Sequence, residues 1–211
     1  MKAVLLSTTI LSALAVSASS SARSRDPKAK KAKSSKGIED TDECKDPLAA
    51  IQHTLQCIAD GDALCAAEGY DAAAFKKIHN GKDTGIVLGD GGEYWQFALQ
   101  LSTLSFSFDH EANIGPNMAS IRYIEGVKFT DGTAFGLPAS TDYPFSAYSV
   151  QHEHALVTVD DDCKMTKWDQ YGDDAEQSTV DNTSGAVIGV FCAMNVFPPN
   201  VCASFGITGP E

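Results

Sequence analysis

The sequence predicts an α+β domain in which helices come first and an antiparallel meander of strands follows. Residues 46–59 place apolar side chains at spacings of three and four, which is the period of an amphipathic helix. From Leu104 to Tyr171, apolar residues alternate with polar ones over several segments, which is the period of half-buried strands. This order of elements is typical of a domain whose helices cover one face of a sheet.

Three helices are expected before the strands. The first spans residues 46–59, has Pro47 in its first turn, and carries an apolar stripe of Leu48, Ile51, Leu55 and Ile58. Asp62 is a suitable N-cap for a short second helix that ends at residue 68. A third short helix is expected over residues 71–78, closed by the turn Asn80-Gly81. Residues 97–104 fit either a helix or a strand.

The strongest strand signal is the segment 150–171, which predicts two strands joined by an acidic turn at residues 160–163. The expected cross-strand pairs are Val159 with Lys164, Val157 with Thr166, Ala155 with Trp168, His154 with Asp169 and Glu153 with Gln170. One face of this hairpin is then mostly apolar, and the other carries His152 and His154. A ligand is expected on only one of these faces.

The N-terminal 43 residues read as two segments that precede the fold. Residues 1–18 combine an early Lys2, an apolar run and small residues around Ala18, which indicates a secretory signal peptide. The run is too short to span a membrane, so no membrane span is expected. Residues 19–43 form a basic arm without large apolar side chains, which cannot bury enough surface to fold.

The charge of the chain is divided between this arm and an acidic body. The whole chain has a formal net charge of −12, but from Cys44 onward 8 basic residues face 23 acidic ones, a net charge near −15. An acidic body repels phosphate backbones, so nucleic acid is not expected as a partner. The folded domain is expected over residues 44–175, with a C-terminal extension over residues 176–211.

The six cysteines predict up to three disulfides in an exported chain. The local pairs are Cys57 with Cys65 and Cys192 with Cys202, which leaves Cys44 with Cys163. The extension is expected to be a polar linker followed by a bridge-tied apolar segment, in preference to a removable lipid-anchor signal. Asn182 begins a glycosylation sequon that suits an exposed linker.

Several of these features together resemble a known family. They are a helix ending in ADGD, further short helices, a strand meander, and a last hairpin that reads KMTKWDQY and is followed by GDD. This pattern resembles the SnoaL-like members of the nuclear transport factor 2-like (ketosteroid isomerase-like) superfamily, over roughly residues 44–174. The resemblance implies a cone, in which a curved, mostly antiparallel sheet wraps around a long N-terminal helix and encloses a pocket, often in a homodimer. Family members include isomerases, cyclases, hydrolases and dehydratases, and others only bind or assemble, so the fold leaves the function open.

The resemblance and the alternation of the strands together assign a ligand pocket. Its expected lining consists of His53, Tyr123, Ala155, Val157, Thr166, Trp168 and Gln170. Glu153 would lie near the far end, where burial raises the pKa of a carboxyl group and suits it to acid–base catalysis. A hydrogen bond between Glu153 and Gln170 at the sheet rim is the alternative. His79 is the second catalytic candidate, with a loop role as its alternative, and for His53 the alternative is a solvent-facing side chain.

The remaining motifs give no cofactor or metal. His152 and His154 lack an obvious third ligand, so an interfacial hydrogen bond to Asp169 is favoured over a metal site. The Gly-rich GDGG segment lacks the Lys-Ser/Thr of a phosphate loop, and no Ser lies in a nucleophile elbow. Neither a bound cofactor nor a metal is therefore expected.

The sequence as a whole predicts a secreted protein that binds a small, largely apolar molecule in a cone pocket. Acid–base chemistry of the isomerase, cyclase or dehydratase type is one interpretation of the pocket, and whether the chain is an enzyme is left open. The alternative is a non-catalytic extracellular matrix or interaction protein whose basic arm binds polyanions.

Overall fold

The computed structural model describes residues 44–207, so the expected signal peptide (residues 1–18) and basic arm (residues 19–43) lie outside the described residues. The helices are α1 (Pro47–Ala59), α2 (Ala63–Glu68), α3 (Glu93–Leu101), α4 (Asp174–Ala193) and α5 (Pro199–Ser204), with a 3-10 turn at Thr133–Phe135. The strands are β1 (Lys76–His79), β2 (Lys82–Asp83), β3 (Ser102–Gly115), β4 (Met118–Phe129), β5 (Tyr148–Val159) and β6 (Met165–Gly172). The α+β class expected from the sequence is the observed one.

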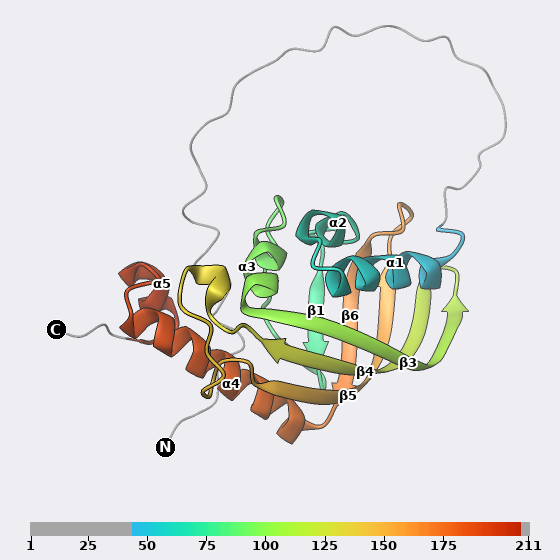
Figure 1. Cartoon of the computed structure of the whole chain (residues 1–211). Helices are drawn as coiled ribbons and strands as arrows, with labels where there is room; N and C mark the ends of the chain where they lie inside the picture. The colour runs from blue at the N-terminus through green and yellow to red at the C-terminus, as the bar shows by residue number, and fades with distance from the viewer. Residues whose placement is uncertain (1–43, 208–211) are drawn as a thin grey trace, which may run out of the picture.

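One curved, unclosed sheet organises the molecule (Figure 1). Its strand order is β2-β1-β6-β5-β4-β3, and every neighbouring pair is antiparallel except β1 with β6, which is parallel. Helix α1 lies across one face of the sheet, and α4 packs beside β4 and β5 at the other end (Figure 1). The candidate site lies in the space between these two helices and the sheet.

The first two helices form where their capping residues predict. The Asp46 carboxylate accepts a hydrogen bond from the Ala49 amide at 3.1 Å, and Pro47 occupies the first turn of α1. Asp62 caps α2 in the same way by accepting from the Cys65 amide at 3.0 Å. The apolar stripe of α1 is buried against the sheet, with Ile51 fully excluded from solvent.

The predicted third helix over residues 71–78 is wrong. The Asp71 side chain accepts hydrogen bonds from the amides of Ala73 and Ala74, which holds this segment in a turn. The chain then continues as β1, which adds to the otherwise unpaired edge of β6. Strand partners supplied by the tertiary fold override the local helical pattern here. The ambiguous segment resolves as α3 followed directly by β3.

The last hairpin forms, but its register is shifted by two residues from the expected one. Val157 lies opposite Trp168 instead of Thr166, and Ala155 lies opposite Gln170. The reason is a wider turn, in which the amide of Asp160 bonds the carbonyl of Lys164, together with an irregularity after Thr158. Because side chains alternate with a period of two, a shift of two leaves each one on its expected face.

The C-terminal extension is helical where a polar linker was expected. Asp173 caps α4 by accepting from the Ala175 amide at 2.7 Å, and acidic residues in the first turn suit the positive end of the helix dipole. Further along, Val187, Ile188 and Phe191 are buried against the sheet. No helix among residues 44–207 is long and apolar enough to span a membrane.

The three cysteine pairs are those expected from the sequence. Cys44 bridges to Cys163, Cys57 to Cys65, and Cys192 to Cys202. The first bridge ties the start of α1 to the β5–β6 turn across 119 residues, and the last ties α4 to α5. Such bridges stabilise chiefly by restricting the unfolded chain.

Candidate functional site

The interior between the sheet, α1, α3 and α4 contains two adjoining cavities. The inner cavity has a volume of about 60 Å³ and lies within the curve of the sheet, under α1 and α3. The outer cavity has a volume of about 210 Å³ and lies between α3, the sheet and α4. The two share six wall residues, namely Lys77, Ile86, Tyr94, Trp95, Leu104 and Glu125. They therefore form one narrow, two-part space.

The walls of the inner cavity are mostly apolar and aromatic. Tyr123, Trp168 and Gln170, three of the residues expected in a pocket, line it. Tyr123 and Trp168 pack edge to face, with ring centroids 6.0 Å apart. Large side chains thus fill much of the cone, which accounts for its small free volume.

Other expected lining residues lie elsewhere. Ala155 and Val157 are fully buried in the core, and neither lines the two cavities. Thr166 lies at the irregular end of the hairpin, where its hydroxyl donates to the Thr158 carbonyl at 3.3 Å. His53 is exposed on the outside of α1. The two-residue register shift places Trp168 opposite Val157, where Thr166 was expected, and the irregularity places the buried Met165 opposite Val159, where Lys164 was expected.

Glu153 is buried on the inner face of β5, with 2% of its surface exposed. Its Oε2 atom has no hydrogen-bond partner among the described residues, and burial raises the pKa of its carboxyl to about 7. The nearby Gln170 amide opposes this rise, although no hydrogen bond of good geometry joins the two side chains. Glu153 lies opposite Gly172 and does not line either cavity.

His79 lies on β1 opposite Gln170. Its Nε2 atom is 3.6 Å from the Asp174 carboxylate at the start of α4 and 3.2 Å from the Asn80 amide nitrogen. Its Nδ1 atom is buried and has no partner among the described residues, and burial is the main cause that lowers the pKa of this imidazole. Like Glu153, His79 does not line either cavity.

Sequence reasoning missed two polar residues that do line both cavities, Glu125 and Lys77. Glu125 occupies an inward position of β4, between Tyr123 and Val127, and burial raises the pKa of its carboxyl. The alternation of β4 contained this signal, because residues 121, 123, 125, 127 and 129 share one face. Lys77 could not be found, because its segment was expected to be a helix.

A third missed carboxyl comes from α4. Asp181 lines the outer cavity, and its pKa is raised by burial. Gln177 holds it by donating to Asp181 Oδ1 at 2.9 Å, and Gln177 itself accepts from Gln151 of β5 at 3.1 Å. These contacts connect α4 to the polar part of the sheet. The extension is therefore part of the cavity wall.

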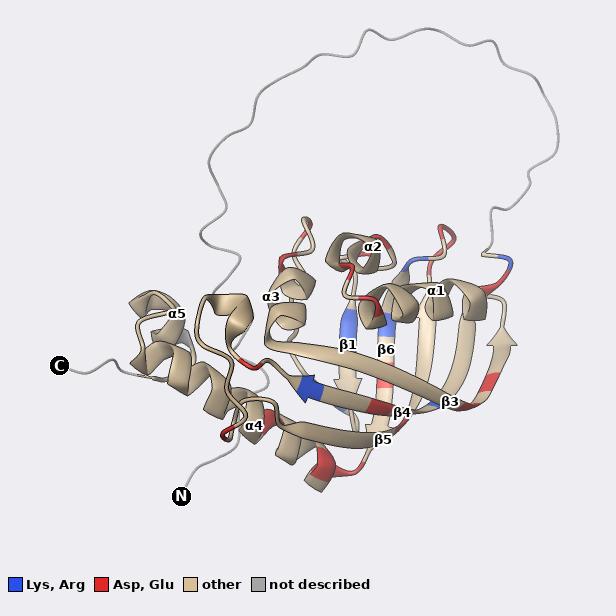
Figure 2. Cartoon of the chain, viewed as in Figure 1, with Lys and Arg blue, Asp and Glu red and all other residues tan. Residues whose placement is uncertain are grey.

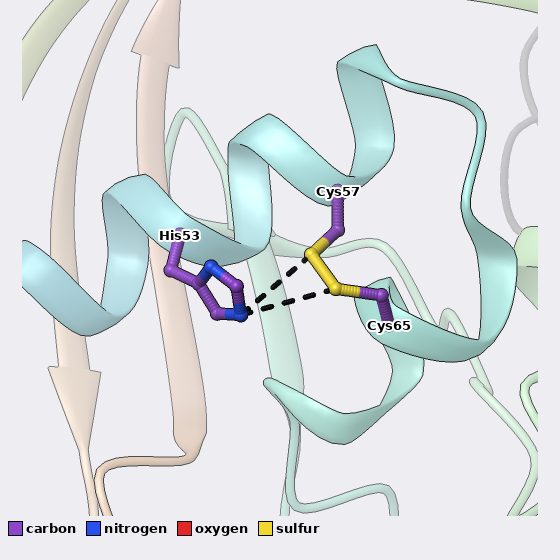
Figure 3. A group of neighbouring side chains, drawn as sticks. All are labelled: His53, Cys57 and Cys65. Carbon is purple, nitrogen blue, oxygen red and sulfur yellow. Dashed lines mark hydrogen bonds between the residues drawn. A yellow bond between two sulfur atoms is a disulfide. The ribbon is translucent and has the colours of Figure 1, made fainter.

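The cluster of His53, Cys57 and Cys65 has the spacing of a metal site but not its chemistry. The His53 Nε2 atom lies 3.9 Å from Cys57 Sγ and 3.8 Å from Cys65 Sγ (Figure 3). The three ligand atoms lie within 4.8 Å of one another, but the two sulfur atoms are joined in a disulfide. Metals bind thiolates, so the oxidised pair offers them no ligand.

The outer face of the sheet carries the two histidines of β5, His152 and His154. His154 lies opposite Tyr171, so its expected pairing with Asp169 is wrong. The His154 Nε2 atom is 2.9 Å from the hydroxyl of Ser120 instead. His152 binds the Glu176 carboxylate of α4 at 2.9 Å through Nδ1. These contacts lie on the face opposite the cavities.

Fold and site together define an α+β protein whose curved sheet wraps around an N-terminal helix. The sheet and the helices enclose a small interior cavity, and buried carboxyl groups line it. This is the architecture implied by the resemblance to the nuclear transport factor 2-like superfamily. No family model matches the chain, and no curated protein matches its sequence.

Solved structures of this architecture are similar to the chain at low sequence identity. A SnoaL-like protein from Shewanella denitrificans is 12% identical over 63% of this chain and 94% of that chain, with a TM-score of 0.46. An LEH-like epoxide hydrolase from M. tuberculosis is 7% identical over 68% and 93%, with a TM-score of 0.47. A Δ5-3-ketosteroid isomerase from Mycobacterium sp. is 13% identical over 60% and 92%, with a TM-score of 0.43. These similarities concern the path of the backbone and leave ligand and reaction undetermined.

Proposed function

We propose that this protein binds a small, largely apolar molecule in its two-part cavity and moves a proton on it, with Glu125 as the acid or base. The main support for this proposal is the position of Glu125, which lines both cavities among aromatic side chains. Burial raises the pKa of this carboxyl, so it exchanges protons nearer to neutral pH than an exposed glutamate does.

The chemistry that suits these groups is proton transfer beside a carbonyl or hydroxyl, as in an isomerase, a cyclase or a dehydratase. The Glu125 carboxylate takes a proton from carbon, and the same carboxyl returns it to another atom. The indole N–H of Trp95 and the amide of Gln170 are buried donors that line the inner cavity and have no partner among residues 44–207. Such donors stabilise the negative charge that develops on a substrate oxygen.

Glu153 and His79 are the catalytic candidates predicted from the sequence. Because neither lines a cavity, we propose that they act indirectly, through the residues of the cavity wall. Gln170 lines the inner cavity and lies opposite His79 of β1, whereas Glu153 lies opposite Gly172, and neither candidate lines a cavity. In this role Glu153 and His79 influence the polarity around the neighbouring Gln170 amide. They are positioning residues and do not touch the substrate.

Deuterium exchange into slender enolisable ketones, such as 2-octanone in D₂O followed by NMR, tests the role of Glu125. The protein is expected to accelerate exchange, and Glu125→Gln is expected to reduce that acceleration by about a hundredfold. The control is Glu68→Gln, which removes an exposed carboxylate away from the two cavities. Equal exchange rates in the native chain and Glu125→Gln would refute the assignment.

Export and self-association are part of the same proposal. Three bridged cysteine pairs are compatible with an oxidising, extracellular environment, and Asn182 is exposed on α4, where an exported chain could carry a glycan. A homodimer is proposed through the outer face of the sheet. That face exposes Ile124, Tyr148 and Tyr171 on three adjacent strands.

A further inference from the structure

Lys77 lines both cavities and is the cation nearest to their carboxyl groups, but it forms no close ion pair with any described residue. It lies on β1 opposite Trp168, and it is the one cation among the described residues that line the two cavities. Within residues 44–207 it forms no ion pair closer than 4.0 Å, whereas Lys167 of β6 binds Asp169 at 2.8 Å. Figure 2 shows the basic segment of β1 formed by Lys76 and Lys77, in a molecule whose other charges are mainly acidic.

Two further donors face the same space. The indole N–H of Trp95, from α3, and the amide of Gln170, from β6, are buried in the wall of the inner cavity and have no partner among the described residues. Leaving a buried donor unpaired is unfavourable, and a bound acceptor would recover this cost. Three donors from three separate elements therefore surround a space that suits an acceptor group.

The carboxyl groups near Lys77 are compatible with an anionic ligand. Glu125 of β4, Glu153 of β5 and Asp181 of α4 all interact electrostatically with Lys77, and burial is the largest cause that raises the pKa of each. His79 of β1 and the cavity-lining phenols Tyr70, Tyr94 and Tyr123 are the other titratable groups in this region, and burial raises the pKa of each phenol, which keeps it neutral. A carboxyl with a raised pKa is more readily neutral, and a neutral carboxyl donates a hydrogen bond to an anion instead of repelling it.

The shape of the space limits the rest of the ligand. The inner cavity measures about 60 Å³ and the outer about 210 Å³, and Tyr94 and Trp95 line both. A chain one carbon wide can pass through such a space, whereas a fused ring system would require the aromatic walls to move. Apart from the polar groups named above, the walls of the inner cavity are aliphatic and aromatic.

We propose that the ligand is a slender aliphatic carboxylic acid whose carboxylate is bound by Lys77, Trp95 and Gln170. Its hydrocarbon chain lies against the apolar walls of the two-part cavity. This inference rests on the proposed function, since it names the class of molecule that enters the same cavity. The carboxylate is the group that orients the molecule for Glu125.

Intrinsic fluorescence gives a direct measurement, because the chain has two tryptophans and both line the inner cavity. The probes are octanoate, 1-octanol and octylamine at about pH 7, which share a chain and differ in the head group. Octanoate is expected to bind at least about tenfold more tightly than 1-octanol, and octylamine more weakly than both. Titration calorimetry on the full folded chain supplies the affinities independently.

Lys77→Met and Lys76→Met are the matched variants, since the two lysines are adjacent on β1 and Lys76 is exposed on the opposite face. Lys77→Met is expected to abolish the preference for octanoate and to leave binding of 1-octanol within about twofold. Lys76→Met is expected to change neither. Retention of 1-octanol binding shows that the variant is folded.

The failures of the two proposals can be told apart. If 1-octanol binds at the tryptophans but octanoate binds no better, or if Lys77→Met keeps the preference, the carboxylate assignment is refuted and cavity binding stands. Phe106→Ala enlarges the cavity and tests whether its size limits binding. If none of the three probes changes the fluorescence or produces heat with either the native chain or Phe106→Ala, cavity binding itself is refuted.

Discussion

Glu153 shows how a single buried carboxyl makes stability depend on pH. Burial raises its pKa to about 7 from the ordinary value of 4.5, so the folded chain binds a proton that the unfolded chain releases between these pH values. Stability is therefore highest below the unfolded pKa and falls as the pH rises through the folded one. Glu125 and Asp181 act in the same direction.

Thermal unfolding between about pH 5 and pH 8 tests this dependence. The melting temperature is expected to fall as the pH rises across the window, and Glu153→Gln is expected to flatten the profile and raise stability at the alkaline end. Part of the slope is expected to remain, because two other buried carboxyls contribute to it. A native profile that rises with pH, or one that Glu153→Gln leaves unchanged, would contradict the assignment.

Gly172 is the residue that makes room for Glu153. A Cβ atom at this position would meet the Glu153 carboxyl closer than van der Waals contact allows, and Glu153 is itself enclosed. Gly172→Ala is therefore expected to lower the free energy of unfolding by about 1–3 kcal/mol in denaturant titrations. The control is Gly189→Ala on α4, where a Cβ meets nothing within 4 Å and helix propensity favours alanine. An equal loss in both variants would show that no contact with Glu153 is involved.

At the scale of elements, patterns that depend on neighbouring residues were predictable and those that depend on distant partners were not. The caps Asp46 and Asp62 predicted where α1 and α2 begin, and the alternation of β4 and β5 predicted their inner faces. Strand β1 was missed because its partner, β6, lies about ninety residues away in sequence, so local propensity indicated a helix.

The same distinction explains the site. The two-residue alternation of β6 predicted its inward face, and therefore predicted that Trp168 and Gln170 line the cavity. Lys77 and Asp181 come from elements whose structure depends on tertiary packing, so no local pattern placed them at the cavity. Glu125 was within reach of the alternation argument. The register of the last hairpin was not, because the width of the β5–β6 turn was unknown.

The docking of α4 depends on one aromatic side chain. Phe191 is fully buried and packs against Phe135, Phe145 and Phe197, with ring centroids 4.4 to 5.7 Å apart. Phe191→Ala is expected to cost about 3–5 kcal/mol of unfolding free energy. Val190→Ala, at a partly exposed position of the same helix, is expected to cost much less. Similar losses in the two variants would mean that α4 is not held by its aromatic cluster.

At the scale of the whole molecule, the sheet has one face covered by helices and one face left open. The open face of β4, β5 and β6 exposes Met118, Ile124, Tyr148 and Tyr171, by between 37% and 63% of their surface area. Large apolar side chains exposed on one sheet face are a feature of interaction sites. A two-fold pairing of this face would bury it without obstructing the cavities, which lie on the other side.

Light scattering after size-exclusion chromatography tests this pairing. The native chain is expected to elute as a dimer at concentrations of tens of micromolar, and Ile124→Asp is expected to elute as a monomer because a dimer would bury two unpaired carboxylates. Ile114→Asp is the control, since Ile114 is also exposed but lies at the end of β3, away from the open face. A native chain that is monomeric, or an Ile124→Asp variant that stays dimeric, would exclude this face as the interface. Melting temperatures of the two variants, measured under dilute conditions, separate a loss of pairing from a loss of folding.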